Sequence, residues 1–323
     1  MRVLVTGGAG YIGGVVAAQL AAAGHEVIVL DDLSTGFADT VPPGATFVKG
    51  TLRDCSAEVL SDGIDAVLHF AAKSLVGESV ADPAKYWSNN LGGTISLLEA
   101  MREMRVRRIV FSSTAAVYGE PERTPITETD PARPTSPYGA SKIAVDTTLS
   151  EFCRLYGFGA VSLRYFNVAG AFQGTDGRWL GERHNPETHL IPNVLAAATE
   201  GRPVRIFGDD YPTPDGTCIR DYIHVTDLAD AHLRALEATR PGEHRIYNMG
   251  NGAGFSVREV IGVCREVTGI DIAADVGPRR AGDPAVLVAS SAKIQSELGW
   301  RASRDLAAMA ADAWRFTQAR SSR

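Results

Sequence analysis

The feature that most constrains the fold of this chain is a glycine-rich turn near its N-terminus. Residues 3–5 form a short β-branched run typical of a buried parallel strand, and they lead directly into Thr6-Gly-Gly-Ala-Gly-Tyr-Ile-Gly13. Residues 15–23 then have the character of a helix that ends at Gly24. Glycines at this spacing let the chain turn tightly and let its backbone approach a pyrophosphate at a helix N-terminus. The turn predicts the first strand–helix unit of a dinucleotide-binding fold.

A pair of acids strengthens this prediction and selects the dinucleotide. A second strand over residues 26–30 ends in Asp31 and Asp32, about 20 residues after the turn, where a carboxylate can accept hydrogen bonds from a ribose diol. Two acids would repel a 2′-phosphate, so the predicted cofactor is NAD and not NADP. A glycine-rich turn without a ligand is the alternative, but strand, glycines, helix, strand and acid occur here in the required order.

The remaining strands and helices predict one α/β architecture. Strands are expected at residues 46–48, 66–72 and 108–111, with a long helix at residues 83–105. We therefore predict a Rossmann-type doubly wound parallel sheet with a smaller C-terminal α/β substrate-binding domain. The predicted domains are residues 1–168, completed by about 218–244, for the cofactor, and residues 169–217 and 245–323 for the substrate. His69 lies inside an apolar strand and is predicted to be a hydrogen-bonded core histidine.

A second motif carries the chemistry. Tyr138 and Lys142 are four residues apart, which places them one turn apart on the same side of a helix. An ammonium near a phenol favours the phenolate, a proton acceptor for an alcohol or sugar hydroxyl. The alternative is an incidental pair on an exposed helix. Thr114 follows the predicted strand 108–111, at the sheet edge where ligands bind in open α/β folds, although loop or capping chemistry would also explain it.

A serine or threonine, a tyrosine and a lysine in this order, after a dinucleotide fold, resemble the short-chain dehydrogenase/reductase superfamily. Further segments resemble the UDP-glucose 4-epimerase family, in the extended branch of that superfamily. These segments are residues 6–13, 76–79, 111–119, 136–139, 163–167 and 221–225. They span nearly the whole chain, and several of them are specific to the nucleotide-sugar branch.

The resemblance implies an activity and a set of roles. The expected reaction is the reversible 4-epimerisation of UDP-galactose and UDP-glucose through a transient 4-keto sugar, with tightly bound NAD. Tyr138 is expected to move the proton of the 4-hydroxyl, Thr114 to hydrogen-bond that oxygen, and Lys142 to hold the nicotinamide ribose and lower the tyrosine pKa. A homodimer through the helices of Asn90 and Tyr138 is also implied.

The residues expected to contact the two ligands follow from the same resemblance. The cofactor set is Gly7, Gly10, Tyr11, Ile12, Gly13, Asp31, Asp32, Thr51, Leu52, Phe70, Ala71, Ala72, Asn89, Ser112, Tyr138, Lys142 and Tyr165. The UDP-hexose set is Ser113, Thr114, Tyr138, Asn167, His189, Leu190, Arg205, Phe207, Arg220, Tyr222, Arg280, Asp283 and Leu287. Arg220 and Arg280 are assigned to the diphosphate because the guanidinium fork binds oxygens bidentately.

Several positions depart from the family pattern or bear on specificity. Thr51 and Leu52 stand in place of an acid that contacts adenine, and Lys73 is shifted from the usual pyrophosphate lysine. His189 replaces an asparagine that binds phosphate and could still donate a hydrogen bond. Leu287 aligns with the residue that limits bulk beside the sugar 2-position, and its intermediate size favours the plain hexose pair.

Other functions remain open at this stage. A 4,6-dehydratase needs an acid pair directly after the threonine, where this chain has Ala115 and Ala116. A non-catalytic NAD sensor would not need the Tyr138–Lys142 pair, and an alcohol dehydrogenase would release its NADH. A 4-epimerase of a UDP-N-acetylhexosamine, UDP-pentose or UDP-glucuronate would share the same catalytic residues.

Composition excludes several broader classes. The chain has 323 residues, a formal net charge of -6 and 45% hydrophobic residues, as in an ordinary soluble globular protein without a general nucleic-acid surface. No signal peptide or membrane-length apolar stretch is present, so a cytoplasmic enzyme is expected. Four scattered cysteines lack zinc or redox spacing, and no metal site is predicted. Residues 170–186 are expected to form a long surface loop, and Ser256 with Glu259 to form a capping box.

Overall fold

A seven-stranded parallel sheet forms the centre of the molecule, which we describe from a computed structural model covering residues 1–280 and 283–321. The strand order is β13-β6-β5-β4-β1-β2-β3. The strands are β1 (Arg2–Thr6), β2 (Glu26–Asp31), β3 (Thr46–Lys49), β4 (Ala66–His69), β5 (Arg108–Thr114), β6 (Gly159–Tyr165) and β13 (His244–Met249). β1 pairs in register with β2 and β4, with Val3 opposite both Val27 and Ala66. Successive strands extend the sheet in one direction from β1 to β3 and in the opposite direction from β4 onward. This reversal of strand order between β1 and β4 creates the crevice in which such sheets bind ligands.

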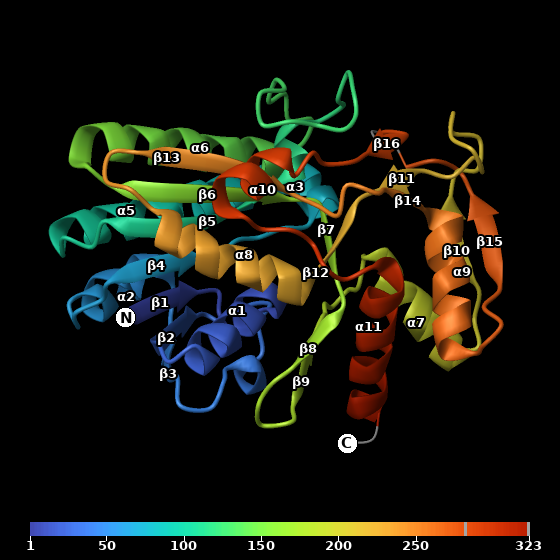
Figure 1. The fold of residues 1–323 in the computed structure, drawn as a ribbon, viewed down its shortest axis with the longest axis horizontal. Coiled ribbons are helices and arrows are strands. Elements are labelled where there is room, and N and C mark those ends of the chain that lie inside the picture. The colour runs from blue at the N-terminus through green and yellow to red at the C-terminus, as the bar shows by residue number, and fades with distance from the viewer. Residues whose placement is uncertain (281–282, 322–323) are drawn as a thin grey trace.

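Helices cover both faces of this sheet because side chains alternate along each strand. Val3 and Val5 of β1 belong to one apolar core with α1 (Tyr11–Ala22) and α8 (Val225–Ala238). Leu4, between them, packs in a second core with α2 (Leu52–Leu60), α5 (Gly93–Glu103) and α6 (Pro137–Tyr156). Figure 1 shows the two helix layers on either side of the strands. The predicted doubly wound α/β class is confirmed.

A smaller second region lies beyond the carboxyl ends of the strands (Figure 1). Its core packs α7 (Leu190–Glu200) and α9 (Val257–Thr268) against α11 (Leu306–Ser321). Short sheets complete it. They are formed by β10 (Val204–Phe207) with β15 (Ala274–Gly277), and by β14 (Phe255–Ser256), β11 (Ile219–Arg220) and β16 (Val286–Leu287). β7 (Asn167–Ala169) and β12 (Tyr222–His224) pair in parallel at the junction.

The predicted capping box opens α9. The Ser256 hydroxyl accepts a hydrogen bond from the amide of Glu259, and the Glu259 carboxylate accepts one from the amide of Ser256. His69 also behaves as predicted, since its two ring nitrogens contact the hydroxyls of Thr6 at 2.7 Å and Thr94 at 2.8 Å inside the core.

Several local predictions were wrong. The segment 170–186, predicted as an unstructured loop, contains a hairpin of β8 (Ala171–Gln173) and β9 (Trp179–Gly181). The hairpin is stabilised by packing of α11 against both of its strands, which no local pattern in the loop reveals. The predicted helix 83–105 is divided into α4 (Pro83–Tyr86), a π-helical segment η2 (Trp87–Gly92) and α5. β4 ends at His69, and α3 (Val76–Ala81) follows it after a short stretch without secondary structure.

The predicted boundary near residue 244, between the cofactor and substrate regions, falls at the start of a strand of the central sheet. β13 pairs with β6 from His244–Ala160 to Met249–Tyr165, so the seventh strand lies beyond the expected end of the cofactor region. α10 (Ala292–Leu298) also packs on the cofactor region, because Ile294 and the nearby Trp300 belong to the core formed by α1 and α8. Two 3₁₀ turns, η1 (Ala38–Thr40) and η3 (Ala115–Val117), complete the elements of the described chain. None of the helices over residues 1–280 and 283–321 is long and apolar enough to cross a membrane.

Candidate active site

A cavity of about 860 Å³ opens at the carboxyl ends of the central strands and reaches into the second region. Its size falls within the range of about 300–1,000 Å³ that is usual for small-molecule sites. Every residue predicted to contact the cofactor lines it: Gly7, Gly10, Tyr11, Ile12, Gly13, Asp31, Asp32, Thr51, Leu52, Phe70, Ala71, Ala72, Asn89, Ser112, Tyr138, Lys142 and Tyr165.

The turn between β1 and α1 has room for a dinucleotide only because it lacks side chains. A Cβ atom on Gly7 would lie 2.6 Å from the Ala71 amide nitrogen, and one on Gly13 would lie 2.3 Å from the Gly7 carbonyl oxygen. Gly7 also has a φ of 73°, which L side chains rarely adopt. No side chain caps α1 and no acid lies in its first turn. The free amides at this helix end therefore suit a pyrophosphate.

The two acids at the end of β2 differ in their surroundings. The Asp31 carboxylate is buried and accepts hydrogen bonds from the amides of Ala9, at 3.0 Å, and Leu33, at 2.8 Å; burial nevertheless raises the pKa of Asp31. Asp32 is exposed, and although partial burial acts to raise the pKa of Asp32, hydrogen bonds from Ser34 hold it below its ordinary value. A negative pair at this edge fits a ribose diol and disfavours a 2′-phosphate.

The predicted catalytic residues meet inside the cavity. α6 begins at Pro137 with Ser136 as its N-cap, which places Tyr138 in the first turn and Lys142 one turn later. The Lys142 ammonium lies 5.9 Å from the centre of the Tyr138 ring and donates a 2.8 Å hydrogen bond to the Ser112 carbonyl. Thr114, the last residue of β5, hydrogen-bonds the Tyr138 hydroxyl.

Burial dominates the electrostatics of both Tyr138 and Lys142. Burial raises the pKa of Tyr138, and the hydrogen bond from Thr114 only partly offsets it. Burial also lowers the pKa of Lys142 to about 7, against an opposing effect of Asp146. The lowering of the Tyr138 pKa by Lys142 together with a bound nicotinamide ring stays a prediction. Desolvation disfavours the charged forms of both side chains, and it outweighs their attraction for each other at this distance.

The substrate residues predicted from the sequence divide into two groups. Seven of them line the cavity: Thr114, Tyr138, Asn167, His189, Arg220, Asp283 and Leu287. Arg220 and Asp283 face each other, with 3.5 Å between a guanidinium nitrogen and a carboxylate oxygen.

Six predicted substrate residues lie outside the cavity lining: Ser113, Leu190, Arg205, Phe207, Tyr222 and Arg280. Arg205 and Arg280 both lie over the ring of Phe207, with guanidinium carbons 5.9 and 3.9 Å from its centre. Tyr222 packs in the apolar core of the second region, and the buried Ser113 hydroxyl donates to Asp146 at 3.3 Å. Their contacts with a substrate remain predictions.

The cavity lining also includes residues outside the predicted sets, among them Glu182 and His184. These two precede His189 in the segment that we expected to be a structureless loop. The only signal available was the alternation Glu182, His184, Glu187, His189 within eight residues. This spacing places ligand-type side chains close together when the backbone doubles back.

With this geometry established, comparison with known proteins assigns the class. Residues 3–250 match the model of the NAD dependent epimerase/dehydratase family. A match over this much of the sequence means that the chain belongs to that family, and NAD is therefore its cofactor.

Individual relatives narrow the class. UDP-glucose 4-epimerase of Streptomyces lividans is 56% identical over 320 residues, covering 98% of this chain and 95% of that protein. UDP-glucose 4-epimerase of Corynebacterium glutamicum is 52% identical over 322 residues, covering 99% and 96%. The crystal structure of UDP-glucose 4-epimerase from Bifidobacterium longum in complex with NAD⁺ and UDP is 37% identical, with a TM-score of 0.92 and coverage of 99% and 98%. The resemblance predicted from the sequence motifs is thereby confirmed.

Proposed function

We propose that this chain is an NAD-dependent 4-epimerase that interconverts UDP-galactose and UDP-glucose. The observation that carries the proposal is the placement of Tyr138, Thr114 and Lys142 in the same cavity as the glycine turn. A proton acceptor and a dinucleotide cradle thus share one enclosed space, as oxidation of a sugar hydroxyl requires. The Ala115–Ala116 pair after Thr114 supplies no additional proton donor, which disfavours a dehydratase.

The chain's own residues account for the proton transfer. Tyr138 removes the proton from the sugar 4-hydroxyl and later returns it, while Thr114 holds that oxygen in hydrogen-bonding distance. NAD, when bound, would supply the acceptor for the hydride of C4 and the source of its return to the opposite face of the sugar ring. The anchored diphosphate lets the 4-keto sugar turn over between the two transfers.

Lys142 has an electrostatic role in this scheme. Its ammonium donates a hydrogen bond to one backbone acceptor, the Ser112 carbonyl. The hydroxyls of a nicotinamide ribose would add acceptors and favour the charged lysine. A charged Lys142 near the phenol, together with the positive nicotinamide ring, then favours the phenolate form of Tyr138. Phenol activation is therefore coupled to cofactor binding.

The substrate end of the cavity supports a nucleoside diphosphate. Arg220 and His189 both line the cavity, which supports a bidentate contact of Arg220 with a phosphate and a single hydrogen bond from His189. We propose that Asp283 contacts the nucleotide ribose and that Asn167, Leu190, Arg205, Phe207, Tyr222 and Arg280 hold the phosphate and uridine. Leu287 lines the sugar end and favours hexoses without an N-acetyl group.

Three wider features belong to the same proposal. Residues 1–168 with the segment from 218 through β13 would form the cofactor domain, and 169–217 with most of the remaining C-terminal chain the substrate domain. All four cysteines are free, in keeping with a reduced cytoplasmic compartment. The chain would work as a homodimer through α5 and α6.

The test uses purified protein with no added NAD. We expect UDP-galactose to be converted to UDP-glucose, identified by chromatography, without accumulation of NADH absorbance. Tyr138→Phe should lower turnover by about 100- to 10,000-fold, the usual contribution of a positioned acid–base group. Tyr156→Phe, at the exposed end of the same helix, is the matched control and should leave turnover unchanged. NADH accumulation on adding NAD would indicate a dehydrogenase instead.

A further inference from the structure

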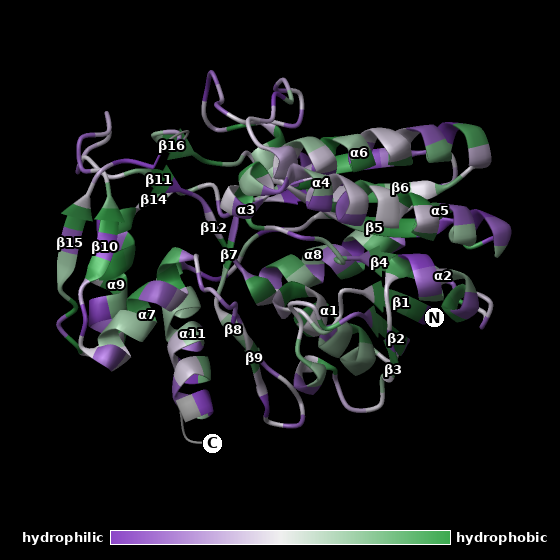
Figure 2. Ribbon diagram, turned by 180° about the vertical axis from the view of Figure 1, so that it is seen from behind, coloured by the Kyte–Doolittle hydropathy of each residue, from purple (hydrophilic) through white to green (hydrophobic). Residues whose placement is uncertain are grey.

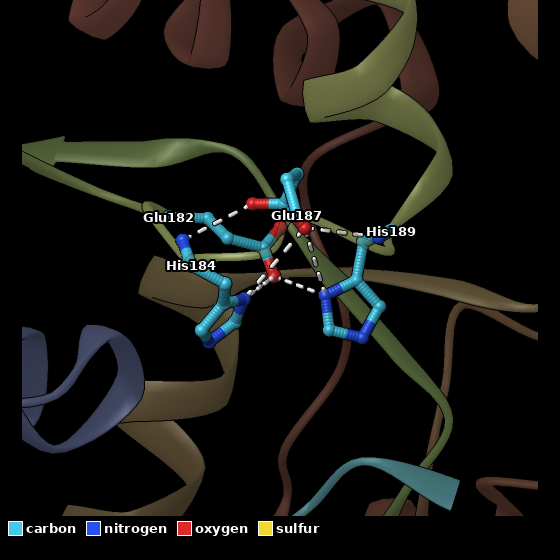
Figure 3. Close-up of side chains that lie close together, drawn as sticks. All are labelled: Glu182, His184, Glu187 and His189. Atoms are coloured by element: carbon cyan, nitrogen blue, oxygen red, sulfur yellow. Dashed lines mark hydrogen bonds and ion pairs between the residues drawn. The ribbon is translucent and has the colours of Figure 1, made fainter. Parts of the chain in front are cut away.

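Four ligand-type side chains form a compact group in the wall of the active-site cavity, between β9 and α7 (Figure 3). Glu182 follows β9 directly, and His189 is the residue before the first turn of α7. His184 and Glu187 lie between them. One donor atom from each residue can be chosen so that all four atoms lie within 4.8 Å of one another.

The donor atoms have the spacing of a coordination shell. Glu182 Oε1 lies 3.2 Å from His184 Nδ1, and Glu187 Oε1 lies 3.7 Å from Nδ1 of each imidazole. A tetrahedral zinc ion with bonds of about 2.0–2.1 Å has neighbouring ligand atoms about 3.3 Å apart. Figure 3 shows both imidazole rings turned toward the two carboxylates, so the four donors converge on one point.

Direct contacts within the group leave a donor unsatisfied. His184 Nδ1 is buried and has no partner with hydrogen-bond geometry, although it faces two carboxylates. Both imidazoles direct Nδ1 at the same oxygen, Glu182 Oε1, and the side chain of Glu182 is only 6% exposed. A buried nitrogen this close to two carboxylate oxygens, without well-formed hydrogen-bond geometry to either, has the position of a metal ligand.

The surrounding backbone holds the carboxylate of Glu187 in place. It accepts hydrogen bonds from the amides of Thr188 at 2.8 Å, His189 at 2.9 Å and His184 at 3.2 Å. Such outer contacts orient metal ligands and are a regular part of metal sites. The group is thus fixed in place rather than formed by mobile surface side chains.

We propose that Glu182, His184, Glu187 and His189 bind one divalent transition-metal cation, with Zn²⁺ the best match. Two imidazoles exclude Mg²⁺ and Ca²⁺, which prefer oxygen ligands, and a four-coordinate N₂O₂ set fits zinc. With four protein ligands the site is structural. The cation would fasten the end of the β8–β9 hairpin to the start of α7 at the cavity wall.

This site would also set the state of His189. If Nδ1 binds the cation, the other ring nitrogen, Nε2, carries the proton and can only donate a hydrogen bond. A donor in the cavity wall is what a phosphate oxygen needs. Histidine instead of asparagine at position 189 would then still donate a hydrogen bond to the phosphate and would also bind the cation.

Equilibrium dialysis against Zn²⁺ tests the proposal independently of catalysis. Protein without a histidine tag is first dialysed against a chelator, and bound metal is then measured per chain. We expect one Zn²⁺ per chain, no displacement by excess Mg²⁺, and the intense visible absorption of tetrahedral coordination when Co²⁺ replaces Zn²⁺. His184→Gln should weaken binding by more than about 100-fold, because loss even of an orienting group costs about 10- to 100-fold.

His25→Gln is the control for binding to histidines in general, because His25 lies outside the group near the N-terminus. It should bind Zn²⁺ as the unaltered chain does. Glu182→Gln is a second variant with the same expected loss, and retained NAD in each variant shows that the fold is intact. Binding below stoichiometry in the unaltered chain, or equal binding by the His184 and His25 variants, would overturn the proposal.

Discussion

Lys142 is a predicted catalytic residue whose burial destabilises the folded protein. Its side chain is almost fully buried, and burial lowers the pKa of this lysine to about 7, well below the ordinary value. The unfolded chain therefore keeps a proton on this lysine up to about pH 10.4, whereas the folded, NAD-free chain keeps it only below about pH 7. Folding loses stability as the pH falls through this window, and the full loss is present below pH 7.

Lys142→Met should remove this loss while filling the same space. We expect NAD-free Lys142→Met protein to unfold at a higher temperature than the unaltered chain at pH 7. The difference should shrink toward pH 10, where the unfolded lysine also loses its proton. The measurement is thermal unfolding by circular dichroism across this range, with epimerase activity abolished in parallel. A difference independent of pH would mean that packing, not charge burial, causes the effect.

Gly13 tests the cofactor turn. A Cβ atom at this position would lie 2.3 Å from the Gly7 carbonyl oxygen, so Gly13→Ala must displace the turn. We expect a loss of about 1–3 kcal/mol in unfolding free energy, typical of overpacking, and little NAD in the purified protein. NAD released by denaturation and counted per chain is the readout.

Gly262→Ala is the matched control for that substitution. Gly262 lies within α9, and a Cβ atom there would meet nothing within 4 Å. Alanine should stabilise the helix by about 0.5–1 kcal/mol and leave bound NAD unchanged. If Gly13→Ala retained NAD as Gly262→Ala does, the turn would not be the cofactor cradle.

At the level of elements, the π-helical segment η2 connects the two halves of the cofactor pocket. It directs Asn90 inward, where its amide accepts from the Lys73 amide at 2.8 Å and donates to the Lys73 carbonyl at 3.0 Å and to the Ser141 hydroxyl at 3.1 Å. One side chain thus ties the segment after β4 to α6. π-Helical segments occur frequently at functional sites.

Asn90→Ala should loosen both attachments. It leaves partly buried backbone groups of Lys73 without their Asn90 partner, at a cost of up to about 1–3 kcal/mol each, so we expect a lower unfolding temperature and faster loss of NAD on dialysis. Glu266→Ala, at an exposed position in α9, should change stability by less than about 0.5 kcal/mol. Equal NAD retention by the two variants would argue against this role of η2.

The elements that could be predicted from sequence are those with local causes. The glycine turn, the Tyr138–Lys142 spacing and the Ser256–Glu259 cap each follow from steric or hydrogen-bonding rules within a few residues. The β8–β9 hairpin could not be predicted, because its stability comes from α11, more than 120 residues away in the chain. The grouping of Glu182 with His184 depended on that hairpin. The π-helical register of η2 likewise follows from tertiary contacts of Asn90.

At the scale of the whole molecule, exposed apolar side chains gather on one side. Of the ten large hydrophobic residues exposed in the described chain, seven lie on or beside α3, η2, α5 and α6: Val76, Val80, Trp87, Ile95, Met104, Leu155 and Tyr156. Figure 2 shows α5 and α6 next to each other at the same end of the molecule. Exposed apolar side chains concentrated on neighbouring elements are typical of an interaction surface, and two-fold symmetry would pair this surface with its own copy.

This surface predicts the oligomeric state. We expect the unaltered chain to have twice its monomer mass of 34.4 kDa in light scattering after size exclusion. Ile95→Glu places a charge on the surface of each copy, twice in a symmetric interface, and should shift the mass to that of the monomer. Val276→Glu, an exposed apolar position on β15 in the other region, should leave the dimer intact. A dimer that survives Ile95→Glu and dissociates with Val276→Glu would place the interface on the substrate region instead.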